Sequence, residues 1–202
     1  MSKIILDLCG GTGSWSRPYK EAGYDVRVIT LPEYDVREYE PPADVYGVLA
    51  APPCTEFSVL NCRAEKRERD FDAGMEIVKA CLRVIKNCNP KWWAMENPRG
   101  YLRAYIGKPV LAFQPWQYGD PWTKNTDIWG NFNVPVPLYS NWQDVPKLDI
   151  YARPGRKPSI AFMHKSEWNK IPQLSFHKPL TDAEFRAMTP PGFAYAFYNA
   201  NK

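Results

Sequence analysis

The amino-acid sequence predicts an α/β fold, in which a doubly wound parallel sheet is followed by a small irregular lobe. Through the first half of the chain, apolar segments that end at glycine- or proline-rich turns alternate with helical segments. Strand–helix–strand units of this kind form parallel sheets. Most of the 20 prolines lie after residue 89, which favours loops and short strands in the second half.

The chain opens with a strand, a glycine turn, a helix and a second strand. We expect the strands over residues 3–8 and 25–31, the turn at 9–13 and the helix over 14–23. Pro32 closes the second strand. Together these segments form the opening unit of a doubly wound sheet.

Two further apolar segments, residues 43–51 and 91–95, are the next predicted strands. Between them, apolar residues repeat at three- and four-residue steps from Phe71 to Ile85. This spacing predicts an amphipathic helix over residues 71–87.

The pattern weakens in the second half. Residues 111–116 and 127–132 are candidate strands, and residues 134–179 are expected to be irregular. A capping box at 181–184 predicts the start of a short helix, and a second helix is expected over 191–201.

Composition narrows the class of protein. The net charge of +4 is compatible with nucleic-acid binding but is also usual in enzymes with small substrates. The five cysteines, an odd number without CxxC pairs, disfavour a disulfide framework or a zinc site and favour a reducing compartment. No apolar run is long enough to cross a bilayer, and Asp7 interrupts the first apolar segment too early for a secretory signal. We therefore expect a soluble, cytoplasmic protein without a membrane partner.

The first motif is Asp7-Leu8-Cys9-Gly10-Gly11-Thr12-Gly13, directly after the first strand. Glycines there let the backbone approach a ligand closely, and the following helix offers free N–H groups. The motif predicts a site for a nucleotide-like cofactor, with a plain tight turn as the alternative. A phosphate-binding P-loop is disfavoured because no Gly-Lys-Ser/Thr follows.

The second motif is Ala51-Pro52-Pro53-Cys54-Thr55-Glu56-Phe57-Ser58, at the end of the third strand. Two prolines stiffen the backbone before Cys54, whose thiol can be exposed and activated at this edge of the sheet. The other cysteines are expected to be small buried apolar side chains; they are Cys9, Cys62, Cys81 and Cys88.

The third motif is Met95-Glu96-Asn97-Pro98-Arg99-Gly100. A glutamate that closes an apolar strand lies at the same edge as Cys54, although an isolated glutamate there could equally cap a helix.

In this order, the three motifs resemble those of the cytosine-5 DNA methyltransferase family. The resemblance covers roughly the first half of the chain, and Gln117-Tyr118-Gly119 with Lys124-x-Thr126 resembles small phage and prophage members. It implies a Rossmann-like S-adenosylmethionine-dependent methyltransferase sheet. Double-stranded DNA is then the expected partner.

The resemblance also implies residue roles. Cys54 would add to cytosine C6, Glu96 would bind the ring N3 and exocyclic amine, and the target base would be flipped out of the duplex. Lys124 is the candidate cation near the cytosine carbonyl, with a solvated lysine as the alternative. The cofactor residues would be Asp7, Gly10, Gly11, Gly13, Trp15, Asp35, Pro52 and Asn199, and the further substrate residues Pro53, Ser58, Asn97 and Gln117. For Asp35 the alternative is a solvated loop residue.

Three departures from the family pattern stand out. Cys9 occupies a position where the family usually has an aromatic residue. Lys124 stands in for an arginine and lacks its planar fork. The chain is also too short for a separate target-recognition domain.

We accordingly predict a catalytic domain over residues 1–133 plus 179–202 and a reduced recognition-like lobe over 134–178. Aromatic and basic residues in the lobe suit stacking on bases and contact with phosphates, although they could simply pack the lobe; examples are Trp142, Tyr151, Arg153, Arg156, Lys157, His164, Lys165 and Trp168. Two other functions stay open: cytosine-5 methylation of RNA or a free nucleotide, and a catalytically idle nucleic-acid-binding module. A nicotinamide-dependent enzyme is disfavoured by the glycine spacing.

Overall fold

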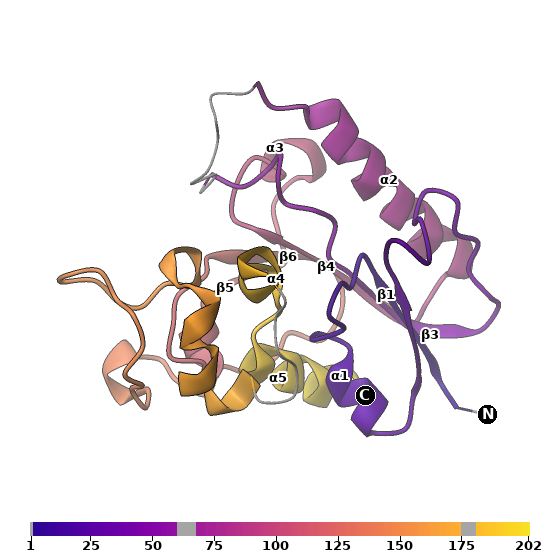
Figure 1. Cartoon of the computed structure of the whole chain (residues 1–202). Coiled ribbons are helices and arrows are strands. Elements are labelled where there is room, and N and C mark those ends of the chain that lie inside the picture. The colour runs from indigo at the N-terminus through magenta and orange to yellow at the C-terminus, as the bar shows by residue number, and fades with distance from the viewer. Residues whose placement is uncertain (1, 60–67, 175–180) are drawn as a thin grey trace.

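The computed structural model describes residues 2–59, 68–174 and 181–202 and contains a six-stranded sheet in the order β2-β1-β3-β4-β6-β5 (Figure 1). β1 pairs in parallel with β2 and β3, and β3 with β4, whereas β6 is antiparallel to both β4 and β5. The predicted α/β sheet is therefore confirmed. The strands are β1 (Ile4–Leu8), β2 (Asp25–Ile29), β3 (Val45–Ala50), β4 (Trp92–Pro98), β5 (Leu111–Phe113) and β6 (Thr126–Asn131).

Helices cover both faces of the sheet, with α2 on one face and α1 and α5 on the other (Figure 1). The predicted 71–87 helix is α2, and the predicted 191–201 helix is α5. The helices are α1 (Arg17–Glu21), α2 (Phe71–Cys88), α3 (Arg103–Ile106), α4 (Asp182–Ala187) and α5 (Pro191–Asn201).

Two elements are shorter than the sequence predicts. α1 begins only at Arg17, because the glycine turn, with positive φ at Gly11 and Gly13, delays the helical conformation. β5 ends at Phe113, since Pro115 begins a short 3-10 helix, Pro115–Tyr118.

The α2 face holds the first part of the core. The buried residues of α2 lie on its sheet-facing stripe, as the periodicity predicts, and pack on apolar residues of β1 and β3. The Asp70 carboxylate accepts a hydrogen bond of 2.9 Å from the N–H of Ala73 and caps the helix, whereas Asn89 ends it with a φ of 43°.

The α5 face is mainly aromatic. Phe193 stacks on Phe113 with ring centroids 3.8 Å apart, and Trp15 packs against Phe193 and Phe197. This packing uses part of the unusually high aromatic content for the core of the protein.

A third cluster of buried side chains belongs to the second half of the chain. It joins irregular segments to Trp122 and to Phe185 of α4. The 134–178 lobe boundary stays a prediction, because its second end lies outside the described residues. The cluster members are Trp122, Ile150, Ile160, Met163, Trp168, Ile171, Leu174, Phe185 and Met188.

Across the described ranges, no helix is both long and apolar enough to span a membrane.

The start of α5 is tied to Asp120, a fully buried carboxylate that accepts a hydrogen bond of 3.0 Å from the N–H of Gly192. Burial raises the pKa of Asp120 from its ordinary value of 3.8 to about 8, although the N–H groups of Gly192 and Phe193 oppose the shift. Between pH 3.8 and about 8, the folded protein thus keeps a proton on Asp120 that the unfolded protein releases.

Asp120→Asn should remove this pH dependence. Because the folded pKa is raised, the contribution of Asp120 to stability is complete below its unfolded pKa and is lost as pH rises towards 8. The free energy of unfolding of the wild type, relative to Asp120→Asn, should fall by about 1.4 kcal/mol per pH unit in that window. Urea unfolding of both proteins at several pH values measures it, and parallel curves would contradict the assignment.

Candidate active site

Three loops meet at the edge of the sheet where β1, β3 and β4 end. Leu8 is in register with Ala50, and Ala50 with Met95, so the following loops begin side by side. The glycine turn, the Cys54 loop and Glu96 are therefore neighbours, as the sequence predicts for the carboxyl ends of parallel strands.

The Cys54 loop is a tight turn with a buried anchor. The carbonyl oxygen of Cys54 accepts hydrogen bonds from the N–H groups of Phe57 and Ser58, at 3.1 and 2.9 Å. The Phe57 side chain is fully buried and fixes the turn to the α2 face of the core. Pro53 is exposed beside Cys54, whereas Pro52 is buried.

Asn97 joins this loop to β4. It is fully buried, and its Nδ2 donates a hydrogen bond of 2.9 Å to the carbonyl oxygen of Pro52. A second link is the bridge between Ser58 and Gly100, where a Cβ on Gly100 would lie 2.0 Å from the carbonyl oxygen of Phe57. Asn97 and Gly100 thus set the distance between Cys54 and the end of β4.

Glu96 and Lys124 form an ion pair within this edge. Nζ of Lys124 lies 3.4 Å from Oε1 of Glu96, and the two side chains are only 9% and 8% exposed. The same Nζ donates to the carbonyl oxygens of Ala187 and Met188 at 3.4 Å. The alternative of a solvated Lys124 is therefore wrong.

The ion pair acts on the Cys54 thiol. Burial is the largest effect and raises the pKa of Cys54 above its ordinary value of 9.0, the charge of Lys124 lowers it, and the charge of Glu96 raises it. The thiol is therefore protonated at neutral pH in this state. Its activation depends on the balance between the two neighbouring charges.

The glycine turn surrounds a buried carboxylate. Oγ of Ser16 donates a hydrogen bond of 2.5 Å to Oδ2 of Asp7, whereas Oδ1 has no hydrogen-bond partner among the described residues. Burial raises the pKa of Asp7 from 3.8 to about 6, so the group is mostly ionised at neutral pH. A Cβ on Gly10 would lie 2.4 Å from the Asp7 carboxyl carbon, so only glycine allows this close packing.

These features fit S-adenosylmethionine. A buried, incompletely paired carboxylate favours a cationic ligand, and the cofactor carries an ammonium and a sulfonium group. A pocket of about 500 Å³ adjoins the turn between α1 and β2, which is within the range of small-molecule sites. None of its lining residues belongs to the Cys54 loop; they are Thr12, Gly13, Ser16, Arg17, Lys20, Glu21, Val26 and Val28.

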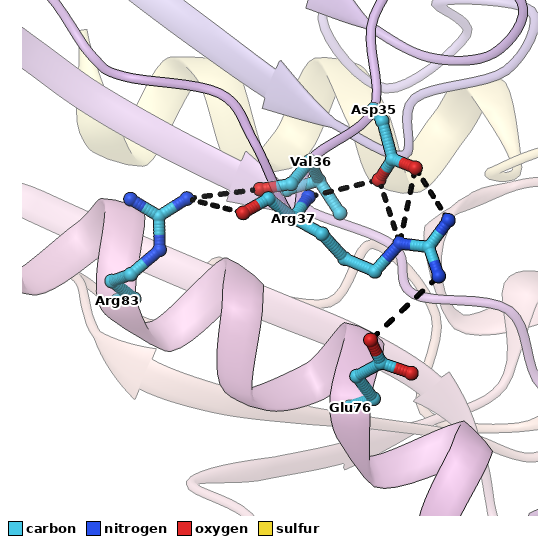
Figure 2. Close-up of polar contacts among 5 residues, drawn as sticks. All are labelled: Asp35, Val36, Arg37, Glu76 and Arg83. Atoms are coloured by element: carbon cyan, nitrogen blue, oxygen red, sulfur yellow. Dashed lines mark hydrogen bonds and ion pairs between the residues drawn. The ribbon is translucent and has the colours of Figure 1, made fainter.

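The Asp35 carboxylate is paired with the guanidinium group of Arg37 (Figure 2). The Arg37 guanidinium donates to both carboxylate oxygens at 2.5 to 3.0 Å, and the Arg37 N–H adds a bond of 2.9 Å. These bonds lower the pKa of Asp35 to about 2. Figure 2 also shows Arg37 reaching towards Glu76 of α2, at 3.7 Å. An adenine amine would have to share Asp35 with Arg37, so its cofactor role stays a prediction.

Two other predicted cofactor residues lie away from an open site. Trp15 is 2% exposed and packs in the aromatic core. Asn199 is exposed on the last turn of α5. Its neighbour Asn201 accepts a hydrogen bond from the N–H of Asn133, which lies just after β6. That end of β6 pairs with the start of β4. That is the opposite edge of the sheet, because α5 runs about 16 Å from its start beside Asp120. This position contradicts the prediction for Asn199.

Gln117 has a structural role. Its Oε1 accepts a hydrogen bond of 2.7 Å from the N–H of Gln114, and its carbonyl oxygen accepts from the N–H groups of Leu138 and Tyr139. The residue that contacts the lysine segment is Gln114, whose Oε1 accepts from the N–H of Lys124 at 3.0 Å. No motif in the sequence indicated Gln114, nor the backbone carbonyls at the end of α4.

Over the residues for which side chains are described, no group of three or more His, Cys, Asp or Glu residues could hold a metal ion.

Comparison with known proteins gives one curated relative and a structural neighbour. No protein-family model matches the chain. The Type II methyltransferase M.DdeI of Desulfomicrobium norvegicum is 28% identical over an alignment of 141 residues, and the match covers 54% of this chain and 32% of that protein. The match confirms the predicted resemblance to methyltransferases. This chain spans about a third of the length of this relative.

The structural neighbour is a protein from an E. coli prophage, proposed to be a DNA modification methyltransferase. It has a TM-score of 0.49 and 14% sequence identity, and the match covers 98% of this chain and 70% of the neighbour.

Opposite charge changes should move Cys54 reactivity in opposite directions. Lys124→Met removes the charge that lowers the thiol pKa, so the pH profile of Cys54 alkylation by iodoacetamide should shift to higher pH. Glu96→Gln removes a charge that raises the pKa, so the profile should shift to lower pH. Mass spectrometry of the Cys54 peptide measures both, with Lys170→Met in the lobe as a control that leaves the profile in place. Shifts of the same sign in the two variants would contradict this electrostatic account.

Proposed function

We propose that this chain transfers a methyl group from S-adenosylmethionine to C5 of cytosine in double-stranded DNA, with Cys54 as the nucleophile. The observation that carries the proposal is the buried Glu96–Lys124 pair, whose charges act on the Cys54 thiol beside a glycine turn that fits the cofactor. The similarity to a Type II methyltransferase supports the same reaction class.

Cys54 begins the reaction. C5 of cytosine is a poor nucleophile, so the thiolate first adds to C6 and makes C5 enamine-like. The bound cofactor supplies an electrophilic methyl group on its sulfonium. After methyl transfer to C5, loss of the C5 proton and elimination of the Cys54 thiolate restore the aromatic ring and free the enzyme.

Glu96 and Lys124 handle the charge that develops on the ring. The Glu96 carboxyl group would hydrogen-bond N3 and the exocyclic amine, which favours electron flow into the ring as the thiolate adds. Lys124 would place a positive charge near the cytosine carbonyl, where electron density also rises. Both side chains are nearly buried, and their interaction with the ring is stronger there than in water.

The other residues hold the site together. Asn97 would keep the Cys54 loop at a fixed distance from Glu96 through its bond to Pro52. Asp7, Gly10, Gly11 and Gly13 would hold the cationic end of the cofactor. Pro53 and Ser58 lie in the same loop as Cys54 and would contact the flipped nucleotide, because C5 and C6 are not accessible within a duplex.

The lobe is proposed as a reduced DNA-contact surface. Nζ of Lys157 lies 5.2 Å from the ring centroids of both Trp116 and Trp142, and Nζ of Lys147 lies 4.4 Å from that of Trp142. Such mixed aromatic and cationic surfaces suit bases and phosphates. Trp168, in contrast, is buried in the third cluster and packs the lobe.

RNA, a free nucleotide or a purely binding role are the alternatives. A protein that only binds does not need a nearly buried glutamate–lysine pair beside a thiol, since burying charges is costly. The choice among nucleic-acid substrates depends on surfaces other than Cys54, Glu96 and Lys124, so the substrate must be measured directly.

Methyl transfer should depend on Cys54 and on DNA. Radiolabelled S-adenosylmethionine should give 5-methylcytosine in unmethylated duplex DNA, and Cys54→Ala should lower the rate by on the order of a thousandfold or more. Cys88→Ala, which removes a thiol at the end of α2, is the matched control and should keep the rate. RNA and cytidine nucleotides are assayed in parallel. Label on adenine, or equal rates for Cys54→Ala and wild type, would contradict the mechanism.

A further inference from the structure

Two thiols that the proposed mechanism does not use lie together behind the glycine turn. Sγ of Cys9, the first residue after β1, is 4.0 Å from Sγ of Cys81, on the buried side of α2. The residues are 72 positions apart in the sequence, so only the fold brings them together. No spacing pattern in the sequence predicts the pair.

The two thiols differ in access. Cys81 is fully buried, and both the contact with Cys9 and burial raise its pKa well above the ordinary value of 9.0. Cys9 is only partly buried. An oxidant therefore reaches Cys9 first, and Cys81 is placed to react with the oxidised sulfur.

We propose that oxidation by a peroxide joins Cys9 to Cys81 and draws the glycine turn towards α2, so that this thiol pair is a modification site that controls cofactor binding. The link to cofactor binding rests on the proposed function. The Cys9 thiolate attacks the peroxide oxygen, which gives a sulfenic acid and releases water or an alcohol. The Cys81 thiol then attacks that sulfur, the S–S bond forms, and the hydroxyl group leaves as water with the Cys81 proton.

In this proposal the turn moves when the bond forms. The sulfur atoms must approach by about 2 Å to reach the disulfide distance. Cys81 belongs to a helix of 18 residues packed along its length, whereas Cys9 begins a turn with positive φ at Cys9, Gly11 and Gly13. The turn is the part that yields, because the helix is held by many buried contacts.

The movement acts directly on the cofactor residues. The N–H of Cys9 donates to the carbonyl oxygen of Ile29 at 2.8 Å, and Gly10 packs closely on the Asp7 carboxylate. A displacement of Cys9 therefore disturbs both the edge of the sheet and the contact between Gly10 and Asp7. Binding sites lose affinity sharply when their groups shift by about 1 Å.

The test uses a protein in which Cys54→Ser and Cys62→Ser leave Cys9, Cys81 and Cys88 as the remaining thiols. After hydrogen peroxide treatment, peptide mapping should find Cys9 linked to Cys81. The Kd for S-adenosylhomocysteine, measured by calorimetry, should rise on the order of tenfold or more and return after dithiothreitol. Adding Cys81→Ala, or Cys9→Ser if that variant does not fold, should abolish the response, whereas Cys88→Ala should keep it.

Two results would overturn the inference: no Cys9–Cys81 peptide after oxidation, or the disulfide with an unchanged Kd. If the reduced protein does not bind S-adenosylhomocysteine, the proposed function fails instead. The disulfide is then judged by the linked peptide and by hydrogen exchange of the amides of residues 10–13, whose rates should change on oxidation because the turn is displaced. Unchanged exchange in that case would also overturn the inference.

Discussion

The Lys124 ammonium group is the contact on which the arrangement of the site depends. Burying a charge costs several kcal/mol unless partners replace the lost water, and Lys124 has Glu96 together with the carbonyl oxygens of Ala187 and Met188. Helix C-termini favour cations, so the end of α4 is a suitable partner. The Lys124 side chain thus holds β4 and the end of α4 at a fixed distance.

The residues that follow α4 extend this connection. The N–H of Thr189 donates to Oγ of Ser14 at 3.0 Å, beside the glycine turn, and the N–H of Gly192 donates to Asp120. The segment from residue 187 to residue 192 therefore contacts Lys124, the glycine turn and the start of α5. Because these contacts share one short segment, a displacement of that segment would reach the glycine turn and the Glu96–Lys124 pair together.

Much of the fold could be predicted, because apolar runs and turn residues determine where parallel strands end. This reasoning placed Cys54, Glu96 and the glycine turn at one edge. It failed where the position of a residue depends on the length of a helix, or where the partner of a side chain is a main-chain group. Asn199 shares a helix with residues near the site, but the length of α5 carries it to the other edge. The partners of Lys124 at the end of α4 are main-chain carbonyls, which any residue supplies, and no side-chain pattern reveals them.

The most direct test of the central claim is a covalent trap on the intact protein. The protein is incubated with S-adenosylmethionine and a duplex that contains 5-fluorocytosine, and the products are mapped by mass spectrometry. After methyl transfer the fluorine cannot leave as the C5 proton does, so the account predicts a stable adduct between Cys54 and the base. An adduct at another cysteine, or methylated DNA without any adduct, would contradict Cys54 as the nucleophile.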